Sequence, residues 1–101
     1  MKRIFKYKLP VGNAVKVMMP REHRILCIRE QGAHGGDEPY IWAIVDDAAE
    51  NVEHTFRIHG TGHTCEGIES WKHVGTFFLQ DGALVFHVFR PMHPSEGKYD
   101  C

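Results

Sequence analysis

The sequence lacks the features that would anchor or cross-link the chain. Its three cysteines, Cys27, Cys65 and Cys101, are an odd number without a CxxC spacing, which argues against a disulfide framework and a zinc ribbon. No apolar run approaches the roughly 18 to 20 residues that span a bilayer, and residues 1–8 are basic and aromatic without a signal-peptide core. We therefore expect reduced thiols, no membrane contact and a cytoplasmic location.

An excess of charge of either sign is also missing. Lys and Arg total 12 against 13 Asp and Glu, so generic nucleic-acid binding is not expected. The chain has 101 residues, of which 43% are hydrophobic, and this suits one hydrophobic core. We predict a single β domain over residues 1–90. Residues 91–101 lack periodicity and contain two prolines, which predicts a flexible C-terminal tail.

Short segments of strand character fill the rest of the chain. Alternation of apolar and polar residues, or short apolar runs, predicts strands over residues 4–9, 14–19, 24–31, 40–46, 52–59, 74–79 and 83–89. The apolar run 40–46 predicts a central strand buried on both faces, and Asp81-Gly82 predicts a hairpin. Residues 66–72 form one short helix or an irregular crossover. The fold class is mainly β: a small antiparallel β-sandwich or roll, or a partly open barrel, of about seven strands with at most one short helix.

The eight histidines raise the question of a metal site. The densest cluster is His54, His59 and His63, but His54 and His59 are an odd number apart and fall on opposite faces of a strand. Gly60 and Gly62 disfavour a helical presentation of His59 and His63. We therefore expect no metal and no cofactor. His87 lies within an apolar strand, where a hydrogen-bonded core histidine is expected.

The segment Gly60-Thr61-Gly62-His63-Thr64 is the most suggestive candidate site. Small residues allow successive backbone N–H groups to point into one concavity and cup an anion, whereas the simpler alternative is a tight turn that needs positive φ at its glycines. Arg57 shares a strand face with His59, and Trp71 flanks a loop and could face a ligand. The predicted ligand-binding residues are Arg57, His59, Gly60, Thr61, Gly62, His63, Thr64 and Trp71.

Two other interpretations stay open. His59-Gly60-Thr61 and His93-Pro94-Ser95 match the His-x-Thr/Ser pattern that two-histidine phosphoesterases use twice, so a metal-independent phosphoester hydrolase using His59, His63 or His93 is the enzyme alternative. A protein partner would instead contact exposed acidic and aromatic residues. The predicted partner-binding residues are Asp37, Glu38, Tyr40, Asp46 and Asp47.

Several segments resemble a family of small uncharacterised phage and prophage proteins, over most of residues 3 to 90. The most specific are Gly60-Thr61-Gly62-His63 and His87-Val88-Phe89, with Gly75-Thr76-Phe77 between them. The resemblance implies a bacterial host and a non-enzymatic accessory protein that inhibits or modulates an anti-phage defence system. It would bind a host protein complex or sequester a nucleotide signal, and an exposed strand edge offers it a route to a homo-oligomer. An interaction protein of virion assembly is a further alternative.

Overall fold

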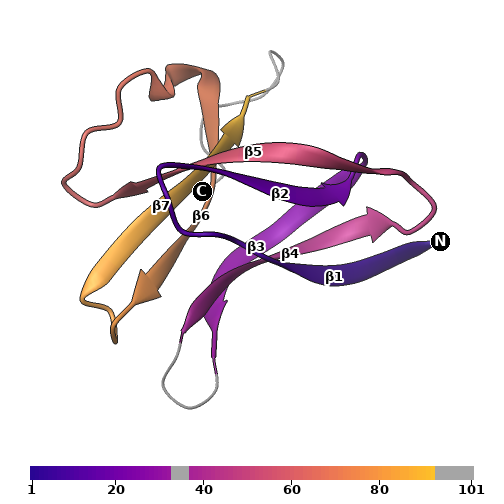
Figure 1. Cartoon of the computed structure of the whole chain (residues 1–101), viewed down its shortest axis with the longest axis horizontal. Helices are drawn as coiled ribbons and strands as arrows, with labels where there is room; N and C mark the ends of the chain where they lie inside the picture. The colour runs from indigo at the N-terminus through magenta and orange to yellow at the C-terminus, as the bar shows by residue number, and fades with distance from the viewer. Residues whose placement is uncertain (33–36, 93–101) are drawn as a thin grey trace.

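The computed structural model of the protein describes residues 1–32 and 37–92 (Figure 1). In this part the chain forms one 3-10 turn, η1 (Ile68–Ser70), and otherwise only strands. The strands are β1 (Lys2–Lys8), β2 (Ala14–Pro20), β3 (His23–Gln31), β4 (Glu38–Asp46), β5 (Asn51–Gly60), β6 (Trp71–Leu79) and β7 (Leu84–Pro91). The predicted fold class is confirmed, and the short helix expected over residues 66–72 is reduced to the η1 turn.

The strands form two antiparallel sheets that do not close into a barrel. One sheet has the order β1-β4-β3 and the other β2-β5-β7-β6. Figure 1 shows the N-terminus beside the turn that connects β4 to β5, where the amide of Asp47 donates to the carbonyl of Met1 at 3.1 Å. No helix in the described ranges is both long enough and apolar enough to cross a membrane.

The core lies between the sheets and is built from alternate strand positions. Its buried hydrophobic residues are Leu9, Val15, Val17, Met19, Ile28, Ile41, Ala43, Val45, Phe56, Ile58, Phe77 and Val88. Strand β4 is central in its sheet, as expected, but its predicted burial on both faces is wrong. Ile41, Ala43 and Val45 are buried whereas Trp42 and Ile44 are only partly buried, because the other sheet covers one face of β4.

The sheets approach each other most closely where β3 and β6 meet. A Cβ atom placed on Gly75 would lie only 2.5 Å from Cγ1 of Ile28 and 2.7 Å from its Cβ. The ladder register shifts in both strands nearby, between Ile25 and Cys27 in β3 and between His73 and Gly75 in β6. Glycine at position 75 therefore allows the two sheets to pack.

The predicted hairpin between β6 and β7 is confirmed. The amide of Gly82 donates to the carbonyl of Leu79 at 3.2 Å, which closes a turn. Its central residues are Gln80 and Asp81, with φ of 52° and 54°, rather than the Asp-Gly pair of the sequence signal. Two positive φ values are typical of the type I′ turn that matches the twist of a hairpin. Residues 93–101, most of the predicted tail, lie outside the described residues.

Candidate functional site

The outer face of the four-stranded sheet collects polar side chains from three strands. Strand β7 lies between β5 and β6, and its His87 pairs with His59 on one side and with Thr76 on the other. The neighbouring residues Ile58 and Val88 are buried in the core. Because side chains alternate along a strand, His59, Thr76 and His87 face away from the core.

The next row of the same face carries a cation and aromatic rings. Phe89 in β7 pairs with Arg57 in β5 and with His73 in β6, and Trp71 begins β6. We call the set of outward residues the histidine face. It comprises Arg57, His59, His73, Thr76, His87 and Phe89, together with Trp71 and the loop 60–64.

A chain of hydrogen bonds ties this face together. Oγ1 of Thr61 lies 2.7 Å from Nε2 of His87, and Oγ1 of Thr76 lies 3.1 Å from its Nδ1. The same Thr76 oxygen lies 3.2 Å from Nε2 of His73. Both ring nitrogens of His87 are thereby engaged, so its ring is held in place. The expectation that His87 is hydrogen-bonded is confirmed, but its place in the core is wrong, because it faces outward and is partly exposed.

The flat side chains of the face lie against one another. The rings of His59 and His73 meet the ring of Phe89 edge-on, with centroids 6.0 and 5.4 Å apart. The guanidinium of Arg57 lies 5.4 Å from the ring centroid of Trp71 and donates to the carbonyl of Glu66 at 2.7 Å. A cation and several aromatic rings thus share one partly exposed surface.

The loop 60–64 is a tight turn whose amides are partly used inside the protein. The amide of Thr61 donates to the carbonyl of Val85 at 3.0 Å, and that of His63 donates to the carbonyl of Gly60 at 3.0 Å. Gly62 has a φ of 86°, which favours glycine. Residues 61–64 are exposed. An anion bound here would rely on side chains, because two of the N–H groups already have partners.

His59 has the least satisfied environment on this face. Its Nδ1 lies 3.1 Å from the carbonyl of Thr64, and since a carbonyl only accepts, Nδ1 donates. Its Nε2 is buried and lacks a hydrogen-bond partner among the described residues. A buried polar atom without a partner lowers stability, so its retention is a reason to look for function at this position.

The predicted ligand-binding residues are therefore neighbours in space. The guanidinium of Arg57 lies over the ring of Trp71, and the ring of His59 is hydrogen-bonded to the carbonyl of Thr64. The sequence interpretation missed His73, Thr76 and Phe89. Their alternation on the two hairpin strands was visible, but the register that aligns them with β5 was not.

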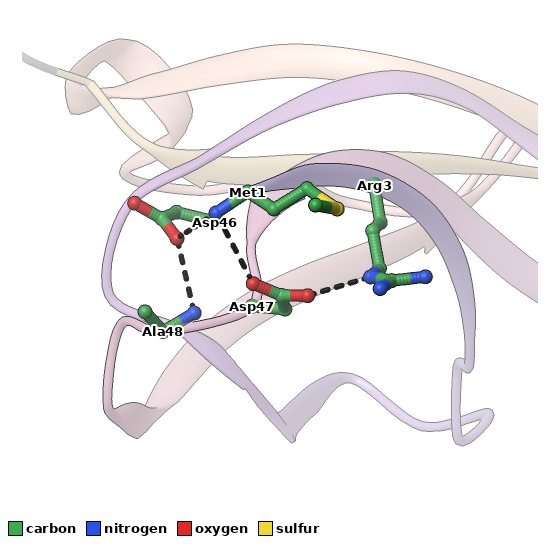
Figure 2. Close-up of polar contacts among 5 residues, drawn as sticks. All are labelled: Met1, Arg3, Asp46, Asp47 and Ala48. Carbon is green, nitrogen blue, oxygen red and sulfur yellow. Dashed lines mark hydrogen bonds and ion pairs between the residues drawn. The ribbon is translucent and has the colours of Figure 1, made fainter.

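Two of the predicted partner-binding residues form ion pairs and hydrogen bonds with the start of the chain (Figure 2). Asp46 Oδ1 accepts from the amide of Ala48 at 3.0 Å and lies 3.4 Å from the ammonium of Met1. Asp47 accepts from Nε of Arg3 at 2.5 Å and also lies 3.3 Å from the ammonium. The Ala48 amide and the ammonium hold the pKa of Asp46 below its ordinary value, and Arg3 does the same for the pKa of Asp47.

The other predicted partner-binding residues lie at the opposite end of β4. Glu38 pairs with Lys8 at 3.3 Å and accepts from the hydroxyl of Tyr40 at 3.3 Å, and Asp37 is exposed. At about 3.3 Å per residue, Glu38 and Asp46 are roughly 25 Å apart along the strand. The structure does not gather these acidic residues into one patch.

The histidines are not arranged as a metal centre in the part of the chain that is described. Within residues 1–32 and 37–92, no group of three or more His, Cys, Asp or Glu side chains could hold a metal ion. His54 lies on the inner side, 3.3 Å from the carbonyl of Met19. His93, required for the second His-x-Ser pattern of the hydrolase alternative, lies outside the described residues.

Comparison with known proteins identifies a family but no characterised relative. No curated protein and no solved structure matches the chain significantly. A family model described as Domain of unknown function (DUF7352) matches residues 1–98, which include all seven strands. The chain belongs to this family.

Proposed function

We propose that the chain is a non-enzymatic binding protein that captures a small nucleotide on the histidine face. The observation that carries the proposal is the contiguous, partly exposed surface of rings and cation formed by Arg57, Trp71, Phe89 and the histidines. Any nucleobase can stack on such an aromatic surface, because every base has a π-face. An arginine adds cation–π attraction to the base or an ion pair to a phosphate.

The loop beside this surface offers groups for the sugar and the phosphate. Thr61, His63 and Thr64 are exposed, and the hydrogen bond from Nδ1 of His59 to the carbonyl of Thr64 holds their loop against the histidine face. Hydroxyl, imidazole and guanidinium groups are donors that a phosphate accepts. The hydrogen-bonded chain through His87 keeps the platform rigid, and a rigid site loses less entropy on binding.

The biological setting that we propose is a phage accessory protein that modulates a bacterial defence system by sequestering its nucleotide signal. Support comes from the segments that carry the family resemblance. Thr61, Thr76 and His87 belong to three different segments of that resemblance and meet on this face.

The test is capture of nucleotides by the purified protein from a bacterial extract. After washing, the protein is heated and the released small molecules are identified by mass spectrometry, and their affinity is then measured by calorimetry. We expect an intact nucleotide. Arg57→Ala and Trp71→Ala are expected to weaken binding at least about tenfold, since each removes a stacking or charged contact. Arg21→Ala, an exposed arginine paired with Glu50 elsewhere, is the matched control.

Two results would contradict the proposal. One is release of a hydrolysed product whose formation is lost in His59→Ala, which would establish the phosphoester hydrolase. The other is the absence of nucleotide together with recovery of a host protein or a virion protein from infected cells.

A further inference from the structure

The outer face of the three-stranded sheet has aromatic rings at its centre. Strand β4 runs between β1 and β3 in this sheet (Figure 1). Ile41 and Ala43 of β4 are buried in the core. Side chains alternate along a strand, so Tyr40 and Trp42 point away from the core, where they are only partly buried. Their rings meet edge-on with centroids 5.8 Å apart. Two neighbouring aromatic rings therefore lie in the middle of a partly exposed surface.

Strand β1 places lysines beside these rings. Lys6 pairs with Trp42, and Lys8 pairs with Tyr40. Residues directly opposite each other in an antiparallel pair project from the same face, so both lysines face outward, and both are exposed. The ammonium of Lys6 lies 4.7 Å from the ring centroid of Tyr40 and donates to the side-chain carbonyl of Gln31. A cation thus already lies over one of the rings.

Strand β3 places arginines on the other flank of β4. Arg29 pairs with Tyr40, and Arg24 pairs with Ile44, the next outward residue of β4 after Trp42. Both arginines are exposed. Neither forms an ion pair with a carboxylate within residues 1–32 and 37–92. We call this surface the aromatic-basic face, and it comprises Lys6, Lys8, Arg24, Arg29, Tyr40 and Trp42.

The acidic side chains of β4 lie at its two ends. Glu38 begins the strand, 3.3 Å from the ammonium of Lys8, and Asp46 ends it, 3.4 Å from the ammonium of Met1. Between these ends, the residues of β1 and β3 that pair with the outward positions of β4 include no carboxylate. The 12 basic and 13 acidic residues of the chain are therefore balanced in total but unevenly distributed over its surface.

We propose that the aromatic-basic face binds single-stranded nucleic acid, with unpaired bases on Tyr40 and Trp42 and phosphates beside the flanking cations. Every base has a π-face that stacks on an aromatic side chain. Phosphates accept charge-assisted hydrogen bonds from lysine and arginine, and their release of counterions favours binding. Because the partner of Lys6 is a neutral amide, a phosphate is the stronger acceptor for its ammonium.

The central position of the rings favours nucleic acid over other polyanions. An acidic protein segment would pair with the cations, but its carboxylates have no flat face to stack on Tyr40 or Trp42. A duplex keeps its bases stacked on one another, so the rings would gain little from it. The aromatic-basic face belongs to the three-stranded sheet and the histidine face to the four-stranded sheet, so this site is independent of the proposed function.

The two tryptophans of the chain allow the site to be located by fluorescence. Trp42 lies on the aromatic-basic face, whereas Trp71 lies on the histidine face. An oligothymidylate of about 10 nucleotides, within the usual range of single-strand sites, is titrated into the full chain. We expect saturable quenching of tryptophan emission that persists in Trp71→Phe and is lost in Trp42→Phe.

Substitution of the arginines tests the phosphate contacts. Arg24→Gln and Arg29→Gln change exposed residues, so both variants should fold. Each is expected to weaken binding roughly threefold or more and to lower the slope of log K against log salt by about 0.7, because one phosphate contact is lost. The matched control is Arg21→Gln, an exposed arginine paired with Glu50, which should leave the affinity and the slope unchanged.

Four results would overturn the inference. Quenching that is lost in Trp71→Phe would place the oligonucleotide on the histidine face and leave the proposed function standing. Polyglutamate that binds as tightly as oligothymidylate would identify an acidic protein segment as the occupant. Equal affinity for the duplex with oligoadenylate would show that the rings do not stack on bases. Absence of binding at low salt, or unchanged affinity in both folded arginine variants, would exclude the site.

Discussion

Gly75 is the residue that lets the two sheets meet. We expect Gly75→Ala to lower the free energy of unfolding by about 1 to 3 kcal/mol, because the added methyl group would overlap Cγ1 and Cβ of Ile28. Chemical denaturation measures the change. Gly12→Ala is the matched control, since its new methyl group would meet only the side chain of Val15 at 3.3 Å. Equal stability of the two variants would show that β3 and β6 are not in this close contact.

His23 should make the stability of the protein dependent on pH. Its pKa is lowered in the folded state, chiefly by burial, so below about pH 6.5 the unfolded chain binds a proton that the folded chain does not. The free energy of unfolding should therefore fall as the pH decreases through this range. Denaturation curves between neutral and mildly acidic pH should show a shallower decline in His23→Gln.

The matched control for His23 is His63→Gln. His63 lies on an exposed loop, so His63→Gln removes a surface histidine while the wall of buried groups around His23 stays unchanged. An identical slope in His23→Gln would mean that other groups cause the pH dependence.

At the scale of elements, the β6–β7 turn is a place where the sequence is not optimal. Gln80 adopts a φ of 52°, which Asn tolerates better than Gln. Gln80→Asn is expected to raise the free energy of unfolding by about 0.5 to 1 kcal/mol and the melting temperature by a few degrees. Gln80→Ala serves as the control and should bring no gain. Calorimetric melting of both variants tests whether residue 80 has a positive φ, and a lower melting temperature for Gln80→Asn would contradict this.

The elements themselves were largely predictable, because their signals are local. The alternation Val52 to His59 and the breaks at Pro10 and Gly60 need no information from distant residues. What local patterns could not show is how many faces of a strand are covered. The apolar run of β4 indicated two buried faces, yet Trp42 and Ile44 lie on the face that points away from the four-stranded sheet and are only partly buried.

For the whole molecule, β1 is an edge strand of the three-stranded sheet. The amide of Asp47 bonds to Met1 and that of Leu9 to Pro39, so the odd-numbered residues of β1 pair with β4 and the even-numbered ones point their backbone groups outward. Ile4 is 60% exposed and Phe5 is 44% exposed. Such an edge can add a strand from a second copy.

We expect self-association through β1 to be weak at low salt and stronger at high salt. An antiparallel pair of β1 strands centred on Phe5 would place Lys2 opposite Lys8, and salt screens that repulsion. Analytical ultracentrifugation at low and high salt measures this self-association. Ile4→Pro removes an outward N–H without touching the bonds to β4 and should abolish association. Association that weakens with salt, or that persists in Ile4→Pro, would exclude this edge.

The sequence by itself determined the strands, the hairpin and the mainly β class, because alternation and turn chemistry act between neighbours along the chain. It also indicated Arg57, His59 and the loop 60–64 as a unit, since they are adjacent in sequence. Only the tertiary structure decided that His73, Thr76, His87 and Phe89 join them, and that cations from β1 and β3 flank the rings of Tyr40 and Trp42. Both sets depend on strand order and register between distant segments, which the packing of the whole core selects.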